Sequence, residues 1–230
     1  MKSRVPFYLL TALAACGGSH VNHAVGSAAV AQDSRDLDLV LVVEGHNIWM
    51  GNETYEKDPD AIYEGNFARL ARSMDAFRRL GGGGSVVSLI SYSHVDNLVV
   101  DHKLLADVRP ALVGKQIDYR SGASTEVLAG MRRAMDLLRK DHARTKAIVL
   151  IGDGAVVNPD EDRSVLQAMV KQAETENIKV LAIIQAGALP VDDEVFSTAI
   201  PAAKVVTSEA EFAQQVDAIV AELLSSKTAP

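Results

Sequence analysis

The sequence predicts an open, mostly parallel α/β sheet with helices on both faces, in one domain. Three apolar stretches support this fold class, at residues 39–43, 147–151 and 180–184, and each runs into a glycine or a polar residue. An apolar run without polar alternation is typical of a strand that is covered on both faces, as in a parallel sheet between helices. Amphipathic segments separate these stretches, and that alternation favours a single α/β domain.

The first half of the chain adds a helix and two strands to this plan. Apolar residues four and three positions apart predict a helix that ends at the glycines of residues 81–84: Tyr63, Phe67, Leu70, Met74 and Phe77. We interpret the glycine run as a helix C-cap, because no Gly-Lys-Ser sequence follows it as in a phosphate-binding loop. A strand at 85–92, a short strand at 98–100 and a short helix near 103–112 are expected next.

The second half repeats the alternation of helix and strand. A stripe with helical spacing predicts a long helix after Thr125: Val127, Leu128, Met131, Met135 and Leu138. A further helix is expected around 165–173 and a last short strand at 204–206. Ser208 and Glu211 have the spacing of a capping box at the start of the closing helix.

Composition narrows the possible partners and chemistry. The chain has 230 residues, 48% of them hydrophobic, which is enough for a full core in one domain. Its formal net charge is −7 and it has no dense basic run, so nucleic acid is not an expected partner. The single cysteine, Cys16, excludes an intramolecular disulfide and a cysteine-based zinc site.

The N-terminus has the features of a secretion signal. Lys2 and Arg4 precede a short apolar run, and small residues lead to Cys16 in the sequence Leu-Ala-Ala-Cys. The run is too short to span a bilayer. The motif is similar to a bacterial lipobox, which implies that residues 1–15 form a lipoprotein signal peptide and that Cys16 is acylated. The alternative is an ordinary cleaved signal ending at Ala31.

The remaining boundaries follow from composition. Residues 16–35 are small and polar and predict a flexible tether, 36–225 form the folded domain, and 226–230 form a C-terminal tail. The lipid would attach the protein to a membrane in the cell envelope. Gly17, directly after the cysteine, is similar to lipoproteins that are sent to an outer membrane.

Several motifs are spread over about residues 36–224. They are the strand that enters Glu44, the Gly-Ala-Ser-Thr turn ending at Thr125, the Ile-Val-Leu-Ile-Gly-Asp-Gly segment at 148–154, and the segments at 176–184 and 199–206. Together they resemble the von Willebrand factor A (vWA) domain family. In that family a divalent metal lies above the sheet at a metal-ion-dependent adhesion site. The family pattern is Asp-x-Ser-x-Ser after the first strand, a threonine in a second loop and an aspartate after a later strand.

The resemblance implies Thr125, Asp153 and Glu44 as candidate metal ligands, with Mg²⁺ as the ion. The first loop departs from the family pattern, because it reads Glu44-x-His46-x-Ile48. Glutamate is one methylene longer than aspartate, histidine offers nitrogen, and isoleucine cannot bind a metal, so metal dependence is expected to be weakened or lost. A shift of one residue would bring Asn47 forward as a substitute. Thr125 suits a helix N-cap equally well, and Asp153 could cap the following turn.

The expected function is a membrane-anchored protein-binding module of the cell envelope, which binds a protein partner at the carboxyl ends of the strands. Aromatic residues on a polar loop are typical of interface centres, although they could also fold inward. The candidate partner-binding residues are Trp49, Met50, Tyr55, His46 and Asn47. Catalysis is not expected, because no glycine-serine nucleophile turn is present. Two alternatives are a metal-assisted hydrolase that uses Glu44 and Asp153, and a structural subunit of an envelope complex with a vestigial site.

Overall fold

The computed structural model describes residues 36–44, 73–82, 84–92, 96–109, 127–152, 154, 156, 158–185 and 196–228. All of them lie in the second of the two units into which the chain divides, Gln32–Pro230. The predicted signal peptide, the tether and Cys16 lie outside the described residues.

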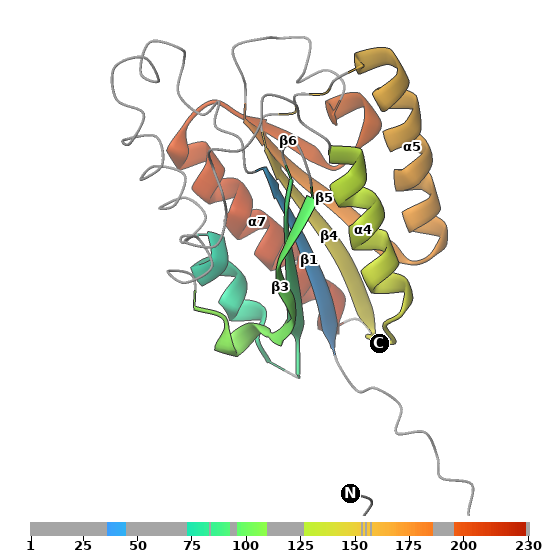
Figure 1. The fold of residues 1–230 in the computed structure, drawn as a ribbon. Coiled ribbons are helices and arrows are strands. Elements are labelled where there is room, and N and C mark those ends of the chain that lie inside the picture. The colour runs from blue at the N-terminus through green and yellow to red at the C-terminus, as the bar shows by residue number, and fades with distance from the viewer. Residues whose placement is uncertain are drawn as a thin grey trace, which may run out of the picture. The chain divides into compact units, whose positions relative to one another are not determined.

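Six strands form one sheet in the order β3-β2-β1-β4-β5-β6. Neighbouring strands are parallel except for β2 and β3, which are antiparallel. The predicted mostly parallel α/β sheet is therefore confirmed (Figure 1). The strands are β1 (Leu37–Glu44), β2 (Val86–Tyr92), β3 (Asp96–Leu104), β4 (Thr145–Gly152), β5 (Ile178–Gln185) and β6 (Ala203–Val206).

β1 lies at the centre of the sheet, and every one of its eight residues is buried. Its apolar run has no polar alternation because its side chains enter two separate cores. Leu39 and Leu41 belong to one core, whereas Val40 and Val42 belong to the other. β1, the strand with the clearest apolar run in the sequence, is thus covered on both of its faces.

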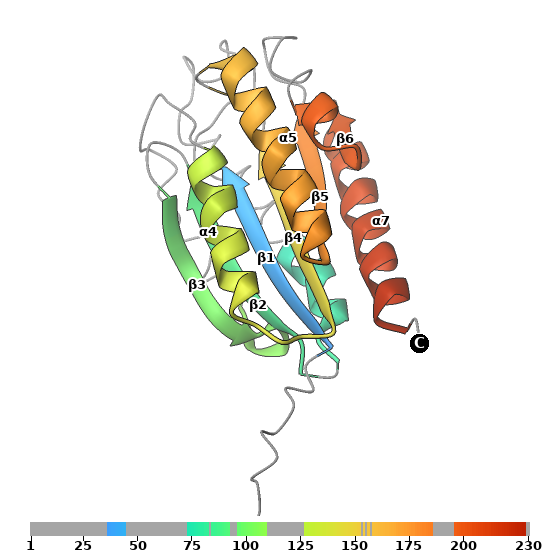
Figure 2. The same ribbon diagram turned by 90° about the vertical axis from the view of Figure 1, so that its right-hand side faces the viewer.

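Helices cover both faces of the sheet (Figures 1 and 2). On one face lie α4 (Val127–Arg139), α5 (Pro159–Thr175) and the helical residues 196–199, which share a core with Val40 and Val42. On the other face lie α7 (Glu209–Thr228) and the helical residues 73–77, which continue into the short 3-10 helix η1 (Arg78–Leu80). These elements pack on Leu39 and Leu41.

The helix ends agree with the sequence predictions. Gly81 caps η1 and donates its backbone N–H to the Arg78 carbonyl oxygen at 3.0 Å, so the glycine run does end a helix. At the start of α7 the Glu211 N–H donates to Ser208 Oγ at 3.2 Å. The Glu211 carboxylate accepts the Thr207 N–H at 2.7 Å, which lowers the pKa of Glu211. α7 continues to Thr228, so three residues of the expected tail are helical.

The strand β3 is longer than the sequence predicts. It runs from Asp96 to Leu104, where we expected a strand of only three residues followed by a helix from residue 103. A short 3-10 helix, η2 (Leu105–Asp107), follows it. The pattern was misleading because β3 is an edge strand with a bulge, and residues 101–104 are exposed. An exposed edge needs no run of apolar residues.

Candidate functional site at the carboxyl edge of the sheet

The order of the strands reverses between β1 and β4. From β1 the chain passes to β2 and β3 on one side, and it returns to β4, β5 and β6 on the other. Ligands of open α/β sheets bind at the carboxyl ends of the strands beside such a point. We call this place the carboxyl edge. Glu44 ends β1 there and Gly152 ends β4.

The Glu44 side chain is turned inward at this edge. The residue is only 3% exposed. A Cβ added to Gly152 would lie 2.8 Å from Glu44 Oε2 and 3.1 Å from Glu44 Cβ. The carboxylate therefore occupies the space that a side chain at position 152 would need. Glycine at the end of β4 is what lets Glu44 lie between the two strands.

Tyr92 meets Glu44 at the same place. It is the last residue of β2, it pairs with Glu44 in the parallel register, and it is 1% exposed. A Cβ at position 152 would clash with the Tyr92 hydroxyl as well as with the Glu44 carboxylate. Sequence reasoning did not single out Tyr92. The feature that could have identified Tyr92 is its position, because it ends the strand beside β1 just as Glu44 ends β1 itself.

The helix α4 packs closely against this pair of strands. A Cβ on Gly130 would lie 2.9 Å from Val42 Cγ1 and 3.4 Å from Tyr92 Cβ. Glycine costs about 1 kcal/mol relative to alanine within a helix, and here it permits a close approach of helix to sheet. The first turns of α4 consequently lie beside Tyr92.

An ion pair fixes the same helix to the start of β3. Arg133 Nη1 lies 2.7 Å from Asp96 Oδ2 and 3.3 Å from the Asp96 carbonyl oxygen. Asp96 pairs with Tyr92 across the antiparallel ladder. The Asp96 carboxylate is thus paired with the guanidinium group of Arg133, which holds α4 against β3.

Of the candidate site residues, Glu44 alone lies in the described part of the chain. The other candidate metal ligands, Thr125 and Asp153, lie outside it. The same is true of the lipidation site Cys16 and of the candidate partner-binding residues: His46, Asn47, Trp49, Met50 and Tyr55.

The described residues supply one ligand of the metal site that the resemblance implies. Mg²⁺ requires near-octahedral coordination by oxygen, and of the three predicted ligands only the Glu44 carboxylate lies among the described residues. It is packed against Gly152 and Tyr92. Because Thr125 and Asp153 lie outside the described residues, the metal site stays a prediction, and we derive no chemistry through a metal at this edge.

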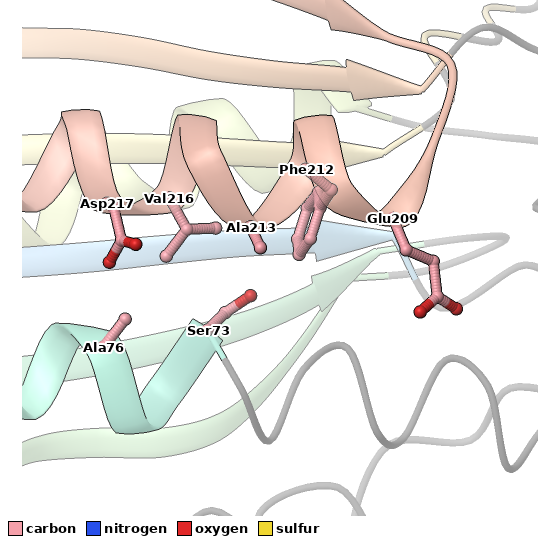
Figure 3. A pocket seen from close by; sticks show the side chains of 7 residues that line it. All are labelled: Ser73, Ala76, Glu209, Phe212, Ala213, Val216 and Asp217. Atoms are coloured by element: carbon pink, nitrogen blue, oxygen red, sulfur yellow. The ribbon is translucent and has the colours of Figure 1, made fainter.

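A small pocket lies on the face of the sheet that α7 covers, between α7 and the helical residues 73–77 (Figure 3). Its volume is about 160 Å³. The wall is largely apolar, with two carboxylates on the α7 side; the lining residues are Ser73, Ala76, Glu209, Phe212, Ala213, Val216 and Asp217. Asp217 forms an ion pair with Arg79 beside the pocket. The pocket belongs to the seam between the two helices and does not reach the Glu44 side of the sheet.

Within the described ranges, no helix combines the length and the apolar character that crossing a bilayer requires.

Comparison with known proteins identifies the fold. No family model matches the chain, and no curated protein matches it. Among solved structures it is similar to the vWF domain of the type V pili tip protein Mfa5 from Porphyromonas gingivalis, with 12% identity and a TM-score of 0.65 over 86% of this chain and 98% of that chain.

Two further structures are similar. The PilB minor pilin from Streptococcus sanguinis has 12% identity and a TM-score of 0.62 over 86% of this chain and 64% of that chain. The SpRpn10 VWA domain has 14% identity and a TM-score of 0.53 over 80% of this chain and 94% of that chain. The chain therefore has a von Willebrand factor A fold.

Proposed function

We propose that this chain is a non-catalytic protein-binding module of the cell envelope, with its binding site at the carboxyl edge of the sheet. The topology supports this position, because the strand order reverses between β1 and β4 and ligands of open α/β sheets bind beside such a point. Trp49, Met50 and Tyr55 follow β1 in the sequence and are the expected anchors for a partner.

The observation that carries the proposal is the inward position of Glu44. A general base or a metal ligand has to reach the reacting water or the ion. Glu44 is 3% exposed and lies against Gly152, which favours a role in the packing of the edge over direct contact with a substrate or an ion. Binding of a protein partner by other residues of this edge needs no such access.

The similar structures support a place on the cell surface. Two of them are a type V pili tip protein and a minor pilin. We propose that acylation of Cys16 holds this chain at the membrane, and that the tether carries the domain toward its partner. The partner is then a protein of the envelope, and binding does not depend on Mg²⁺.

A quantitative capture experiment tests the proposal. The wild-type chain and its variants are immobilised and titrated with solubilised envelope proteins, in chelator and in excess Mg²⁺. Trp49→Ala or Tyr55→Ala should weaken binding of the captured protein by about 2 kcal/mol, roughly 30-fold. Glu44→Gln should have a smaller effect, and chelator none. Leu224→Ala is the matched control, because Leu224 is an exposed apolar residue on α7.

The hydrolase alternative predicts the opposite order. If Glu44 acts in metal-assisted hydrolysis, Glu44→Gln should lower turnover by about 100-fold or more on a panel of ester, peptide and phosphate substrates. Metal-dependent turnover that disappears in this variant would overturn the binding proposal. Loss of capture in Leu224→Ala equal to that in Trp49→Ala would also contradict it.

A further inference from the structure

Three metal-binding side chains meet at the other end of the sheet, which we call the amino edge. Asp38 is the second residue of β1, His102 lies near the end of β3, and Asp141 lies in the turn between α4 and β4. His102 Nε2 lies 2.8 Å from Asp141 Oδ2, and His102 Nδ1 lies 3.8 Å from Asp38 Oδ2. One ligand atom from each residue can be chosen so that all three lie within 4.8 Å of one another.

The backbone of β3 is deformed where it presents the imidazole. The register of β2 and β3 shifts between Val87 and Leu89, opposite residues 101 and 102. His102 has a φ of 47°, a conformation that costs free energy for a residue other than glycine. Its N–H donates to Ser88 Oγ at 3.0 Å, which holds the bulge. Bulges redirect side chains, and this one directs His102 toward the two aspartates.

The aspartates are fixed and buried. Asp38 is 1% exposed and Asp141 is 4% exposed. The turn holds the Asp141 carboxylate, because Asp141 Oδ1 accepts the Ala143 N–H at 2.8 Å. The His102 side chain is 34% exposed and forms the open side of the cluster. Two carboxylates and one imidazole thus meet in a poorly solvated place, where a carboxylate requires a cation or hydrogen-bond donors beside it.

We propose that Asp38, His102 and Asp141 bind one transition-metal ion of the Zn²⁺ type. The ligand set of one imidazole nitrogen and two carboxylate oxygens selects such an ion over Mg²⁺ or Ca²⁺, which prefer oxygen alone. Three protein ligands leave a fourth tetrahedral position, and the exposed side of His102 turns that position to solvent. An exogenous ligand such as water or a partner's carboxylate can occupy it.

Binding requires small movements of the side chains. Zinc sets its tetrahedral ligand atoms about 3.3 Å apart, at bond lengths of about 2.0–2.2 Å. His102 Nε2 and Asp141 Oδ2 would separate by about 0.5 Å from their hydrogen-bond distance, with the ion in place of the proton. Asp38 Oδ2 lies 3.8 Å from the other ring nitrogen, Nδ1, so the partly exposed His102 ring would have to rotate to bring the ion within reach of Asp38.

This site is separate from the carboxyl edge. Asp38 and Glu44 are six residues apart on one strand, which corresponds to about 20 Å at about 3.3 Å per residue. A metal at the amino edge therefore leaves the proposed binding function of the carboxyl edge unchanged, and the two proposals can fail independently.

Zinc titration of the full chain tests the site. Isothermal titration calorimetry with Zn²⁺, in excess Mg²⁺ to occupy any oxygen-only site, should give one more equivalent for the wild type than for His102→Gln or Asp141→Asn. Any residual affinity in these variants should be lower by about 100-fold, since even the loss of an outer-shell group costs 10–100-fold. One control should bind like the wild type: His142→Gln, which replaces the exposed histidine beside Asp141.

X-ray absorption at the zinc edge keeps the test valid if a variant fails to fold. The wild type with one equivalent of Zn²⁺ should show one imidazole, oxygen ligands and no sulfur. Equal stoichiometry in the wild type and in folded His102→Gln would overturn the proposal. A spectrum with two or more imidazoles or with sulfur would also overturn it, because the ion would then have ligands other than Asp38, His102 and Asp141.

Discussion

A single glycine determines the position of the Glu44 carboxylate. Gly152 ends β4 directly beside the end of β1, and the volume that its missing side chain leaves is filled by Glu44 and Tyr92. The two groups come from neighbouring strands in register. The conformation of the carboxyl edge thus depends on a residue that carries no functional group.

Gly152→Ala should destabilise the domain by about 1–3 kcal/mol, since overpacking a filled site forces its neighbours off their rotamers. The added Cβ would lie 2.8 Å from Glu44 Oε2 and closer still to the Tyr92 hydroxyl. Urea unfolding measures the loss. Gly82→Ala is the matched control, because a Cβ there meets nothing within 4 Å, and it should be nearly neutral.

A second variant tests the cause of that loss. Tyr92→Phe removes the hydroxyl that the new Cβ would meet, so it should recover part of the stability in the Gly152→Ala background. Equal losses in Gly152→Ala and Gly82→Ala would show that the edge adapts without cost. A loss in Gly152→Ala that Tyr92→Phe does not reduce would show that the hydroxyl is not its cause.

The sequence identified some of these residues and not others, for a physical reason. Glu44 is visible because it interrupts an apolar run at the point where a parallel strand must end. Tyr92 is hidden because a tyrosine at the end of a strand looks like ordinary core. His102 could not be predicted as part of a cluster, because its direction depends on a bulge that pairs two residues of β3 against one of β2.

At the scale of elements, an ion pair joins α4 to α5. Arg139 Nε lies 2.8 Å from Glu176 Oε2, and Arg139 Nη2 lies 2.9 Å from Glu176 Oε1. The hydrogen bonds from Arg139 lower the pKa of the Glu176 carboxyl, and those to Glu176 raise the pKa of Arg139. Two parallel bonds of this kind give a planar and directional contact.

Glu176→Gln should cost about 0.5 kcal/mol at about pH 7, a small value because both side chains are partly exposed and solvent screens the pair. Because the folded-state pKa of Glu176 is lowered, its contribution is present above the unfolded-state pKa. It is lost as the pH falls through the folded-state pKa. Urea unfolding at about pH 7 and about pH 3 should therefore show the difference from the wild type shrinking in acid.

The neighbouring Glu174→Gln is the matched control for this pair, since Glu174 is an exposed glutamate in the last turn of α5, two residues before the C-cap Glu176. It should change stability little at either pH. A Glu176→Gln deficit that is the same in acid and at neutral pH would show that packing, and not the charge, holds the two helices together.

Most elements were predictable because burial on both faces leaves a strong apolar pattern. β1, β4 and β5 lie inside the sheet, and their runs are complete in the sequence. β3 lies at an edge, and its last four residues are exposed, three of them polar or charged, so the sequence pattern favoured a helix there. The capping box of α7 was predictable because it depends on a fixed spacing of three residues.

At the scale of the whole molecule, the folded domain and its proposed anchor are separate parts of the chain. If Cys16 is acylated, Cys16→Ala should leave the protein unprocessed or move it from the membrane fraction to the soluble fraction. Several acyl chains give durable attachment, at about 0.8 kcal/mol per buried methylene. Detergent partitioning and mass spectrometry of the mature N-terminus measure this. Ser27→Ala, within the tether, should behave like the wild type.

An unmodified mature N-terminus at Gln32 would contradict the anchor and indicate an ordinary cleaved signal. The folded domain would be unaffected by this outcome, because all of its described residues lie within Gln32–Pro230.

The two edge strands of the described sheet, β3 and β6, affect whether neighbouring copies of the chain can aggregate. Molecules attached to one membrane meet at high local concentration, and unpaired strand edges can then join sheets of neighbouring copies into aggregates. β6 has only four residues, with Lys204 exposed, and β3 combines its bulge with the exposed charges of Asp101 and Lys103. Short length, charge and a bulge each prevent a second strand from adding to an edge. If the chain is anchored as proposed, the bulge that directs His102 toward Asp38 and Asp141 would also help to keep the sheets of adjacent copies apart.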